Sequence, residues 1–319
     1  ARPDVGMKGY HFRQTADIDC SGISTWFDIE LQGIFDGGGF TIMGRKLEKP
    51  FYLFKNTQPE SVIKNVKLKN LGLVIVAKES EIYDCQSTHT LFSNLNGCCV
   101  LSCSSDQDLC NSTINSVIKY CSAELRIVYD NAEGSNFFSC KAGDSFFYGS
   151  PVQCVIQDCL TNIKSDGQKG FSSGSLVDCQ LERCFVYGRN DDIFSGTISG
   201  GSGFTPELTR GYIKNSFLGL IKGRNFDFRI CNPIPMEVNG ALFTFAQAIK
   251  NLQKTREYEI ELFNNYSLDQ NKIGLIYGKD DKDGPQGQSI SAQLATQRFF
   301  ENTLGWDFEN IWYWDDANN

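Results

Sequence analysis

The sequence is short of three things: long apolar runs, basic charge and histidine. No apolar run approaches the roughly 18 residues of a membrane-spanning helix, so no transmembrane segment is expected. The 38 acidic side chains outnumber the 30 basic ones and give a formal net charge of −8 at pH 7. This balance lacks the basic surface that nucleic-acid binding requires, and no nucleic acid is expected among the partners.

Metal and cofactor motifs are also missing. The chain has two histidines, and neither the Cys98-Cys99 pair nor the spacing from Cys179 to Cys184 matches a zinc site. The glycines at 37–39 are not followed by the Lys-Ser/Thr of a phosphate-binding loop, so they are interpreted as a tight turn. The sequence therefore predicts neither a metal site nor a cofactor.

What the sequence does contain is one short pattern that returns every 17 to 20 residues. It consists of an aliphatic residue, any residue, a small or turn-prone polar residue, and then a cysteine or another small residue. Less regular copies at Phe137–Cys140 and Ile193–Gly196 fill two double gaps. A fixed period of this kind indicates a solenoid. The clear copies begin at Ile63, Ile82, Val100, Ile118, Ile156, Leu176 and Ile213.

A period near 19 is too short for a pair of helices but fits one coil of a parallel β-helix. Asn or Asp at the third position suits a bend between two strands, because both residues tolerate left-handed backbone conformation. The fourth residue then points inward, with Val66 below a column of cysteines and Gly196 and Ser216 above it. At about 4.8 Å per coil, nine coils make a rod of roughly 40 Å. The predicted column contains Cys85, Cys103, Cys121, Cys140, Cys159 and Cys179.

The cysteine count favours reduced thiols over a disulfide framework. The total of 13 is odd, and six cysteines occupy a repeat position where a small buried apolar residue is needed. Parallel side chains on neighbouring coils also fit the dihedral angle of a disulfide poorly. The chain is therefore expected in a reducing compartment, such as a host cytosol, or on an export route that tolerates thiols.

Two segments near the start carry a family resemblance. Residues 36–42 read D-G-G-G-F-T-I, and residues 63–73 read I-K-N-V-K-L-K-N-L-G-L. They resemble the GLUG-motif repeat proteins of bacteria, in which an F-D-G-x-G-x-T-I turn leads into I-K-N-L-G-L coils. The match is good over residues 10–76 and weakens through residue 216, where cysteines replace the aliphatic residues. The resemblance implies a right-handed parallel β-helix in an exported bacterial protein, and it carries no catalytic residues with it.

The repeat divides the chain into a rod and a cap. Residues 1–60 are expected to form the entry to the β-helix, residues 61–229 its regular coils, and residues 230–319 a C-terminal α+β cap or small domain. The fold class is thus an all-β solenoid with an α+β capping region. A second inward column of bulkier side chains is expected at Phe54, Phe92, Leu109, Phe147 and Phe204.

The cap has its own expected elements. Apolar spacing predicts helices over 242–252 and 291–300, with a strand at 274–277 between them. A solenoid cannot leave its last coil exposed, so an aromatic cluster near the end is expected to seal it. The members of this cluster are Trp306, Phe308, Trp312 and Trp314.

Carboxylates on the flank of the rod are the residues that would carry glycan cleavage, since this chemistry needs two carboxyl groups at a fixed separation. Three of the candidates occupy the bend position, where Asn serves equally, and the other two follow a turn-like Gly-Arg-Asn. Structural roles are therefore favoured for all of them. A Cys85–His89 dyad is disfavoured because the thiol points inward. The candidates are Asp158, Asp178, Asp191 and Asp192, together with Asp84.

The sequence favours a binding or interaction module over an enzyme. The long flank of a solenoid offers a surface for a host or cell-surface protein or for a glycan, as in an adhesin or an injected virulence effector. The alternative is an enzyme, either a glycan-cleaving β-helix or a toxin-like effector with its site in residues 230–319. The expected location is outside a bacterium, on its surface or in a host cytosol, with the cytoplasm as the alternative.

Overall fold

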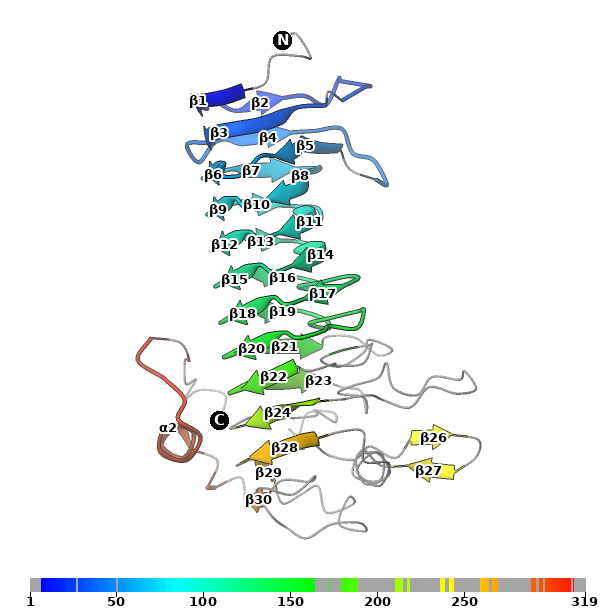
Figure 1. Ribbon diagram of the computed structural model, residues 1–319, viewed down its shortest axis with the longest axis vertical. Helices are drawn as coiled ribbons and strands as arrows, with labels where there is room; N and C mark the ends of the chain where they lie inside the picture. Colours follow the sequence, from blue (N-terminus) through cyan, green and yellow to red (C-terminus); the bar gives the residue numbers. More distant parts are fainter. Residues whose placement is uncertain are drawn as a thin grey trace. The chain divides into compact units, whose positions relative to one another are not determined.

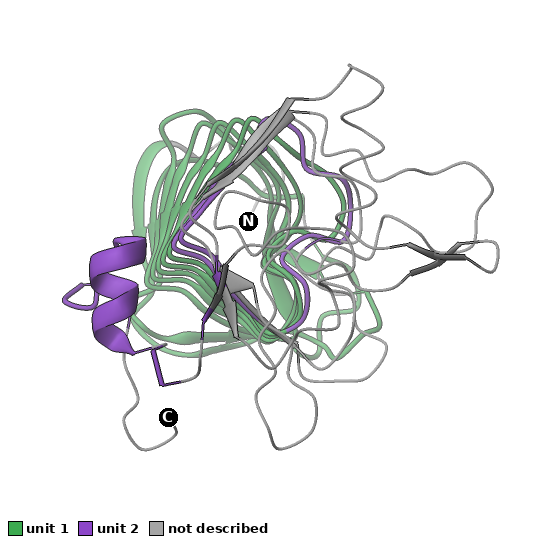
Figure 2. Cartoon of the chain, turned by 90° about the horizontal axis from the view of Figure 1, so that it is seen from below, with its two compact units in different colours: residues 1–143 green, residues 144–319 purple. Residues whose placement is uncertain are grey.

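The structure is a computed structural model, and the chain divides into two compact units, residues 1–143 and 144–319, coloured separately in Figure 2. Most of the described elements in both units are short parallel strands (Figure 1). The predicted β-solenoid with a helix near its C-terminus is confirmed. The structure describes residues 7–26, 28–49, 51–163, 172, 179–188, 210–214, 217–218, 236–238, 241–243, 259–263, 266–268, 288–290, 293–294, 296–310 and 312.

Unit 1 is a coiled chain with three faces, each a row of parallel strands. The first face contains β1 (Met7–Arg13), β3 (Glu30–Asp36), β6 (Val62–Lys64), β9 (Glu81–Tyr83), β12 (Cys99–Leu101), β15 (Val117–Lys119) and β18 (Asn136–Phe138). The second contains β2 (Ile18–Asp19), β4 (Thr41–Met43), β7 (Lys67–Lys69), β10 (Gln86–Ser87), β13 (Ser104–Ser105), β16 (Ser122–Ala123) and β19 (Lys141–Ala142). The third contains β5 (Phe51–Thr57), β8 (Leu71–Lys78), β11 (Phe92–Asn96), β14 (Cys110–Ile114) and β17 (Ala132–Glu133).

The repeated aliphatic residue is the centre of each first-face strand. Ile63 pairs with Ile82, and Ile82 pairs in turn with Val100, so that successive copies of the pattern lie in register. All three side chains are fully buried, because each coil covers the apolar residues of the next. The repeat therefore sets the register of the first face.

The bend after each of the first-face strands β6, β9, β12, β15 and β18 is left-handed, as predicted. Ser102 and Tyr120 adopt this conformation as readily as Asn or Asp, so the coil geometry rather than the residue type dictates it. The residue after each of these five bends is buried, which confirms the inward column of Val66 and four cysteines in unit 1. The φ angles are 55° at Asn65, 54° at Asp84, 52° at Ser102, 57° at Tyr120 and 51° at Ser139.

A second left-handed bend precedes each of the same five first-face strands, and sequence reasoning missed it. Its residues share no side-chain type: they are Glu60, Glu79, Gly97, Asn115 and Gly134. The residue after the bend is a buried Ser or Cys two positions before the aliphatic residue, and this periodic Ser/Cys was the available signal. The column contains Ser61, Ser80, Cys98, Ser116 and Ser135.

The predicted column of bulky residues needs one correction. Phe54 and Phe92 are buried as expected, but the partner of Phe92 on the next coil is Cys110, not Leu109. Leu109 is buried one position earlier, in a neighbouring column with Leu91. Two consecutive residues point inward at this corner, and spacing alone did not distinguish them.

Unit 2 contains two parallel rows of strands and one antiparallel hairpin. One row is β20 (Val155–Gln157), β22 (Cys179–Glu182), β24 (Arg210–Lys214) and β28 (Glu259–Phe263). The other is β21 (Leu160–Ile163), β23 (Phe185–Gly188), β25 (Phe217–Leu218), β29 (Tyr266–Leu268) and β30 (Gln288–Ile290). The hairpin is β26 (Met236–Val238) with β27 (Ala241–Phe243). Parallel pairing thus continues within the residues that were expected to form the cap.

Two copies of the repeat were placed wrongly in unit 2. Ile156 pairs with Leu181 rather than Leu176, so Cys184, not Cys179, follows the bend at this coil. The coil is 25 residues long, and a constant period could not locate it. Strand β22 also pairs directly with β24. The predicted copy at Ile193 therefore supplies no strand between them in this row. The copy at Ile213 is confirmed by its pairing with Leu181.

The C-terminal segment forms helix α2 (Gln297–Leu304), which overlaps the helix predicted over 291–300. The side chain of Thr296 accepts a hydrogen bond from the Phe299 amide at its start, and Gly305 ends it with a φ of 69°. The predicted helix over 242–252 is wrong at its first residues, which lie in strand β27. Positions 196, 204, 216, 244–252, 274–277 and 314 lie outside the described residues.

The predicted aromatic cluster is present where the structure describes it. Trp306 is buried, and its ring stacks on Trp312 with centroids 4.3 Å apart and contacts Phe300 at 4.9 Å. Phe299 contacts Tyr266 of strand β29 at 5.0 Å, which joins the helix to the second row of unit 2. The cluster therefore attaches α2 to the solenoid strands.

Candidate functional site

The most distinctive surface feature of unit 1 is a hollow of about 340 Å³ beside strand β5, which we call the aromatic hollow. Three aromatic rings and one isoleucine supply its apolar wall, while hydroxyl and charged groups lie at its rim. This composition is typical of a small-molecule or sugar site, where apolar surface is combined with a few polar groups. The lining residues are Ser24, Thr25, Trp26, Asp28, Phe51, Tyr52, Lys55 and Ile75.

The aromatic wall is fixed by packing between coils. The rings of Trp26 and Phe51 stack with centroids 5.9 Å apart and an interplanar angle of 17°. Tyr52 pairs with Gly72 on the next coil, and a Cβ atom at Gly72 would lie 2.3 Å from the tyrosine ring. A glycine at this position is therefore needed for the ring to lie flat against strand β8.

The charges at the rim neutralise each other. Lys55 Nζ lies 2.6 Å from Asp28 Oδ2, and this hydrogen bond, followed by the carboxylate charge, raises the pKa of Lys55. Burial, with a smaller effect from Asp108, raises the pKa of Tyr52, so its hydroxyl stays protonated at neutral pH. The hollow thus presents aromatic rings, hydroxyl groups and a solvent-exposed ion pair.

A second hollow, of about 390 Å³, lies at the corner between the first and second faces. Asp36 accepts hydrogen bonds there from the Gly38 amide at 2.9 Å and from Asn65 Nδ2 at 3.0 Å. The Asn65 bond most strongly, and then the Gly38 bond, lower the pKa of Asp36, so it is ionised at neutral pH and is no general acid. The lining residues are Arg13, Asp36, Gly38, Gly39, Asn65, Lys67, Asp84 and Gln86.

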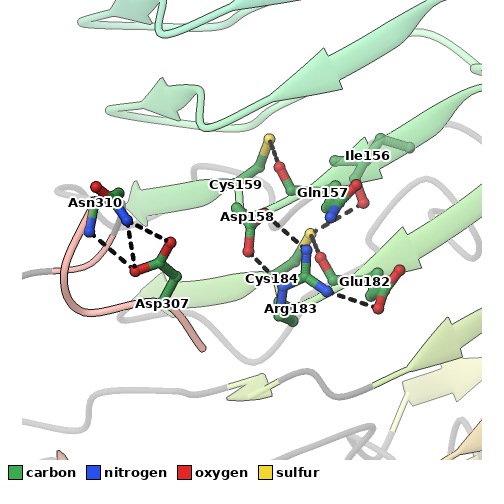
Figure 3. A network of polar contacts seen from close by, with 9 residues as sticks. All are labelled: Ile156, Gln157, Asp158, Cys159, Glu182, Arg183, Cys184, Asp307 and Asn310. Atoms are coloured by element: carbon green, nitrogen blue, oxygen red, sulfur yellow. Dashed lines mark hydrogen bonds and ion pairs between the residues drawn. The ribbon is translucent and has the colours of Figure 1, made fainter. Parts of the chain in front are cut away.

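Among the predicted catalytic aspartates, Asp158 is placed most clearly (Figure 3). It is buried at a left-handed bend, and its Oδ1 and Oδ2 accept from Arg183 Nε at 2.7 Å and NH2 at 2.9 Å. Arg183 also donates to Glu182 at 2.7 Å. Both carboxylate oxygens are thus engaged in holding one coil to the next, as a structural role requires.

Of the other predicted catalytic aspartates, Asp84 lies within the described residues. Asp84 has the left-handed conformation of the bend and lies at the second hollow of unit 1. Positions 178, 191 and 192 lie outside the described residues. The Cys85 thiol is buried and donates to the Tyr83 carbonyl at 3.3 Å, so it forms no dyad with His89.

The segment after α2 lies beside the Asp158–Arg183 pair (Figure 3). Asp307 accepts hydrogen bonds from the side chain and the amide of Asn310. These bonds, the side-chain one first, lower the pKa of Asp307, and the charge of Arg183 acts in the same direction. The arrangement is a closed turn and offers no free acid.

The cysteine column is built from buried, neutral thiols. Cys103, Cys121 and Cys140 each donate to the carbonyl oxygen two residues earlier at 3.3 Å, and the Cys103 amide donates to Cys121 Sγ at 3.4 Å. Burial raises the pKa of the Cys103 and Cys121 thiols well above the ordinary value and that of Cys184 to about 12. The cysteines within the described residues are thiols and not disulfides.

We expect a thiol reagent at pH 8 to label native protein slowly and chiefly at Cys20 and Cys99, the two described cysteines that are partly exposed. Reactivity follows the thiolate fraction, which burial suppresses at the other positions. After denaturation without reductant, at least ten thiols should be counted with the same reagent. A count near one would require six disulfides and would contradict the reduced column.

Comparisons with known proteins found no match: no family model, no curated protein and no solved structure matches the chain. No helix in the described part of the chain is long and apolar enough to cross a membrane. The candidate site therefore rests on its own geometry. Sequence reasoning missed the aromatic hollow because its residues come from three separate stretches outside the regular repeat or at its edge. The available signal was Trp26, an isolated tryptophan in the entry segment.

Proposed function

We propose that this protein is a glycan-binding module and that the aromatic hollow is its binding site. The observation that carries the proposal is the stacked Trp26–Phe51 pair beside Tyr52, with the Lys55–Asp28 ion pair at the rim. The C–H groups of a pyranose ring pack against an aromatic face, while its hydroxyl groups need polar partners around that face. The hollow supplies both. Glycan cleavage is disfavoured there, because it uses two carboxyl groups and the lining of the hollow contains one, Asp28.

The wider setting is part of the proposal. We infer an exported bacterial protein of the adhesin or effector type, related to the GLUG-motif proteins. The support for this is the D-G-G-G-F-T-I turn and the I-K-N coil that follows it. A column of reduced thiols favours delivery to a reducing compartment such as a host cytosol.

The test is retention on a glycan panel by the wild-type protein and by Trp26→Ala. We expect Trp26→Ala to weaken binding at least about tenfold, which corresponds to about 1.4 kcal/mol. Tyr10→Ala is the matched control, since this tyrosine is 59% exposed, lies outside the hollow and is expected to leave binding unchanged. Equal retention by wild type and Trp26→Ala would refute the site. Reducing-sugar release from the same panel would favour an enzyme instead.

A further inference from the structure

The aromatic hollow is one end of an outward row along the third face of unit 1. Strand pairing places Phe54, Val74, Phe92 and Cys110 in register, and a bridge places Val128 beside Cys110. Each of these residues points inward and is buried. The residue after each one therefore lies in a parallel row on the outside. That outer row is Lys55, Ile75, Ser93, Asn111 and Tyr129.

The middle of this row is a surface of hydroxyl and amide groups. Asn94 Nδ2 lies 3.2 Å from Ser93 Oγ, and Asn111 Nδ2 lies 3.5 Å from the same oxygen. Each amide retains an oxygen that can accept from a sugar hydroxyl. Ile75, which is 37% exposed, adds an apolar patch between the hollow and these polar groups.

Tyr129 closes the far end of the row with another aromatic face. It is 41% exposed, and the guanidinium of Arg126 lies 4.6 Å from its ring centroid. Arg126 is itself held by Asp108, with Nε 2.7 Å from Oδ1. The ring is thus positioned by an ion pair beneath it, as Trp26 is positioned by Phe51 at the other end.

The step of the row matches the repeat of an extended sugar chain. Neighbouring strands are about 4.8 Å apart, so the four steps from Lys55 to Tyr129 span about 19 Å. One step is close to the advance of one β-1,4-linked pyranose along an extended chain. A rigid ladder of this spacing can place one polar or aromatic contact under each of four to five sugar residues.

We propose that the outer row is a track for a neutral, extended polysaccharide that enters at the aromatic hollow and ends on Tyr129. The proposal rests on the proposed function, because Trp26 supplies the first contact. Charge favours a neutral chain: Lys55 is neutralised by Asp28, and the exposed Asp130 beside Tyr129 would repel an acidic polysaccharide.

The test is calorimetric titration with cello-oligosaccharides of two to six residues, with oligogalacturonides as the acidic comparator. The dissociation constant should fall at least about tenfold from the dimer to the pentamer and then remain level. Tyr129→Ala should weaken binding of the pentamer about fivefold and leave binding of the dimer unchanged. Tyr129→Phe keeps the ring and should bind as wild type. Tyr120→Ala, at an exposed bend outside the row, should have no effect.

The outcomes separate the two proposals. If Trp26→Ala binds every length as wild type does, the hollow itself is refuted. If Trp26→Ala weakens binding but affinity is independent of length and of Tyr129, the hollow stands and the track is refuted. Tighter binding of oligogalacturonides would overturn the neutral ligand, and failure of every cello-oligosaccharide to bind would overturn the track. Melting temperatures of the variants exclude loss of the fold.

Discussion

Cys121→Asp is expected to lower the unfolding free energy by about 4 kcal/mol at pH 7. The Cys121 side chain is 1% exposed and lies between Cys103 and Cys140 in the inward column, where its thiol donates to the Val100 and Lys119 carbonyl oxygens. A carboxylate at this position would lose its hydration and would face carbonyl oxygens and neighbouring thiols rather than a cation. The measurement is denaturant unfolding, in which the midpoint concentration should fall while the dependence of the unfolding free energy on denaturant concentration stays unchanged.

The matched control is Ser102→Asp, at the bend one position before the column residue Cys103 of the previous coil. Asp84 already occupies the equivalent bend, so this substitution should change stability by less than about 0.5 kcal/mol. Burial would raise the pKa of the introduced carboxyl in Cys121→Asp above its unfolded value. Its penalty is therefore present above the unfolded pKa and should shrink as pH falls toward about 4. Equal midpoints for Cys121→Asp and wild type would show that the column is misplaced.

Arg183→Met should cost about 3 kcal/mol, because it leaves the buried Asp158 carboxylate without its cation. The side chains of Asp158 and Arg183 are only 5% and 17% exposed, and two short bonds join them. The measurement is chemical denaturation of the full chain. Tryptophan fluorescence follows the unfolding of unit 2, because Trp306 and Trp312 stack there.

The control for Arg183→Met is the double variant with Asp158→Asn. This change removes the unpaired charge, so the double variant should recover part of the stability that Arg183→Met loses. Arg126→Met offers a second comparison, because Arg126 and Asp108 form a similar ion pair in unit 1. A double variant less stable than Arg183→Met would show that the charge of Asp158 is satisfied by other groups.

The repeat predicted what depends on local spacing. A bend before an inward cysteine is a local rule, and it held from Asn65 to Ser139 because each of those coils is 18 or 19 residues long. The rule failed at Leu176, where a longer coil shifts the register by five residues to Leu181. The second bend had no consistent residue type from Glu60 to Gly134, since backbone geometry is imposed there by the neighbouring coils.

The candidate site was harder to predict than the fold. The sequence analysis selected aspartates, because a carboxylate is a candidate general acid or base by its residue type alone. Trp26, Phe51 and Ile75 meet only through the register of β5 on β8 and through the entry segment that lies against them. The spacing of these three residues along the sequence does not predict that they line the same hollow. The function of a solenoid flank emerges from which coils are adjacent, not from any one coil.

The uniform interior column has a consequence for how such a protein changes length. Cys103 and Cys121 stand 18 residues apart and present the same small side chain to the coils on either side. A duplicated coil would therefore meet the same interior above and below, and it would need no new complementary surface. It would also add one residue to the outer row on the third face. On the proposed polysaccharide track, duplication of a single coil would therefore lengthen the recognised ligand by about one sugar residue.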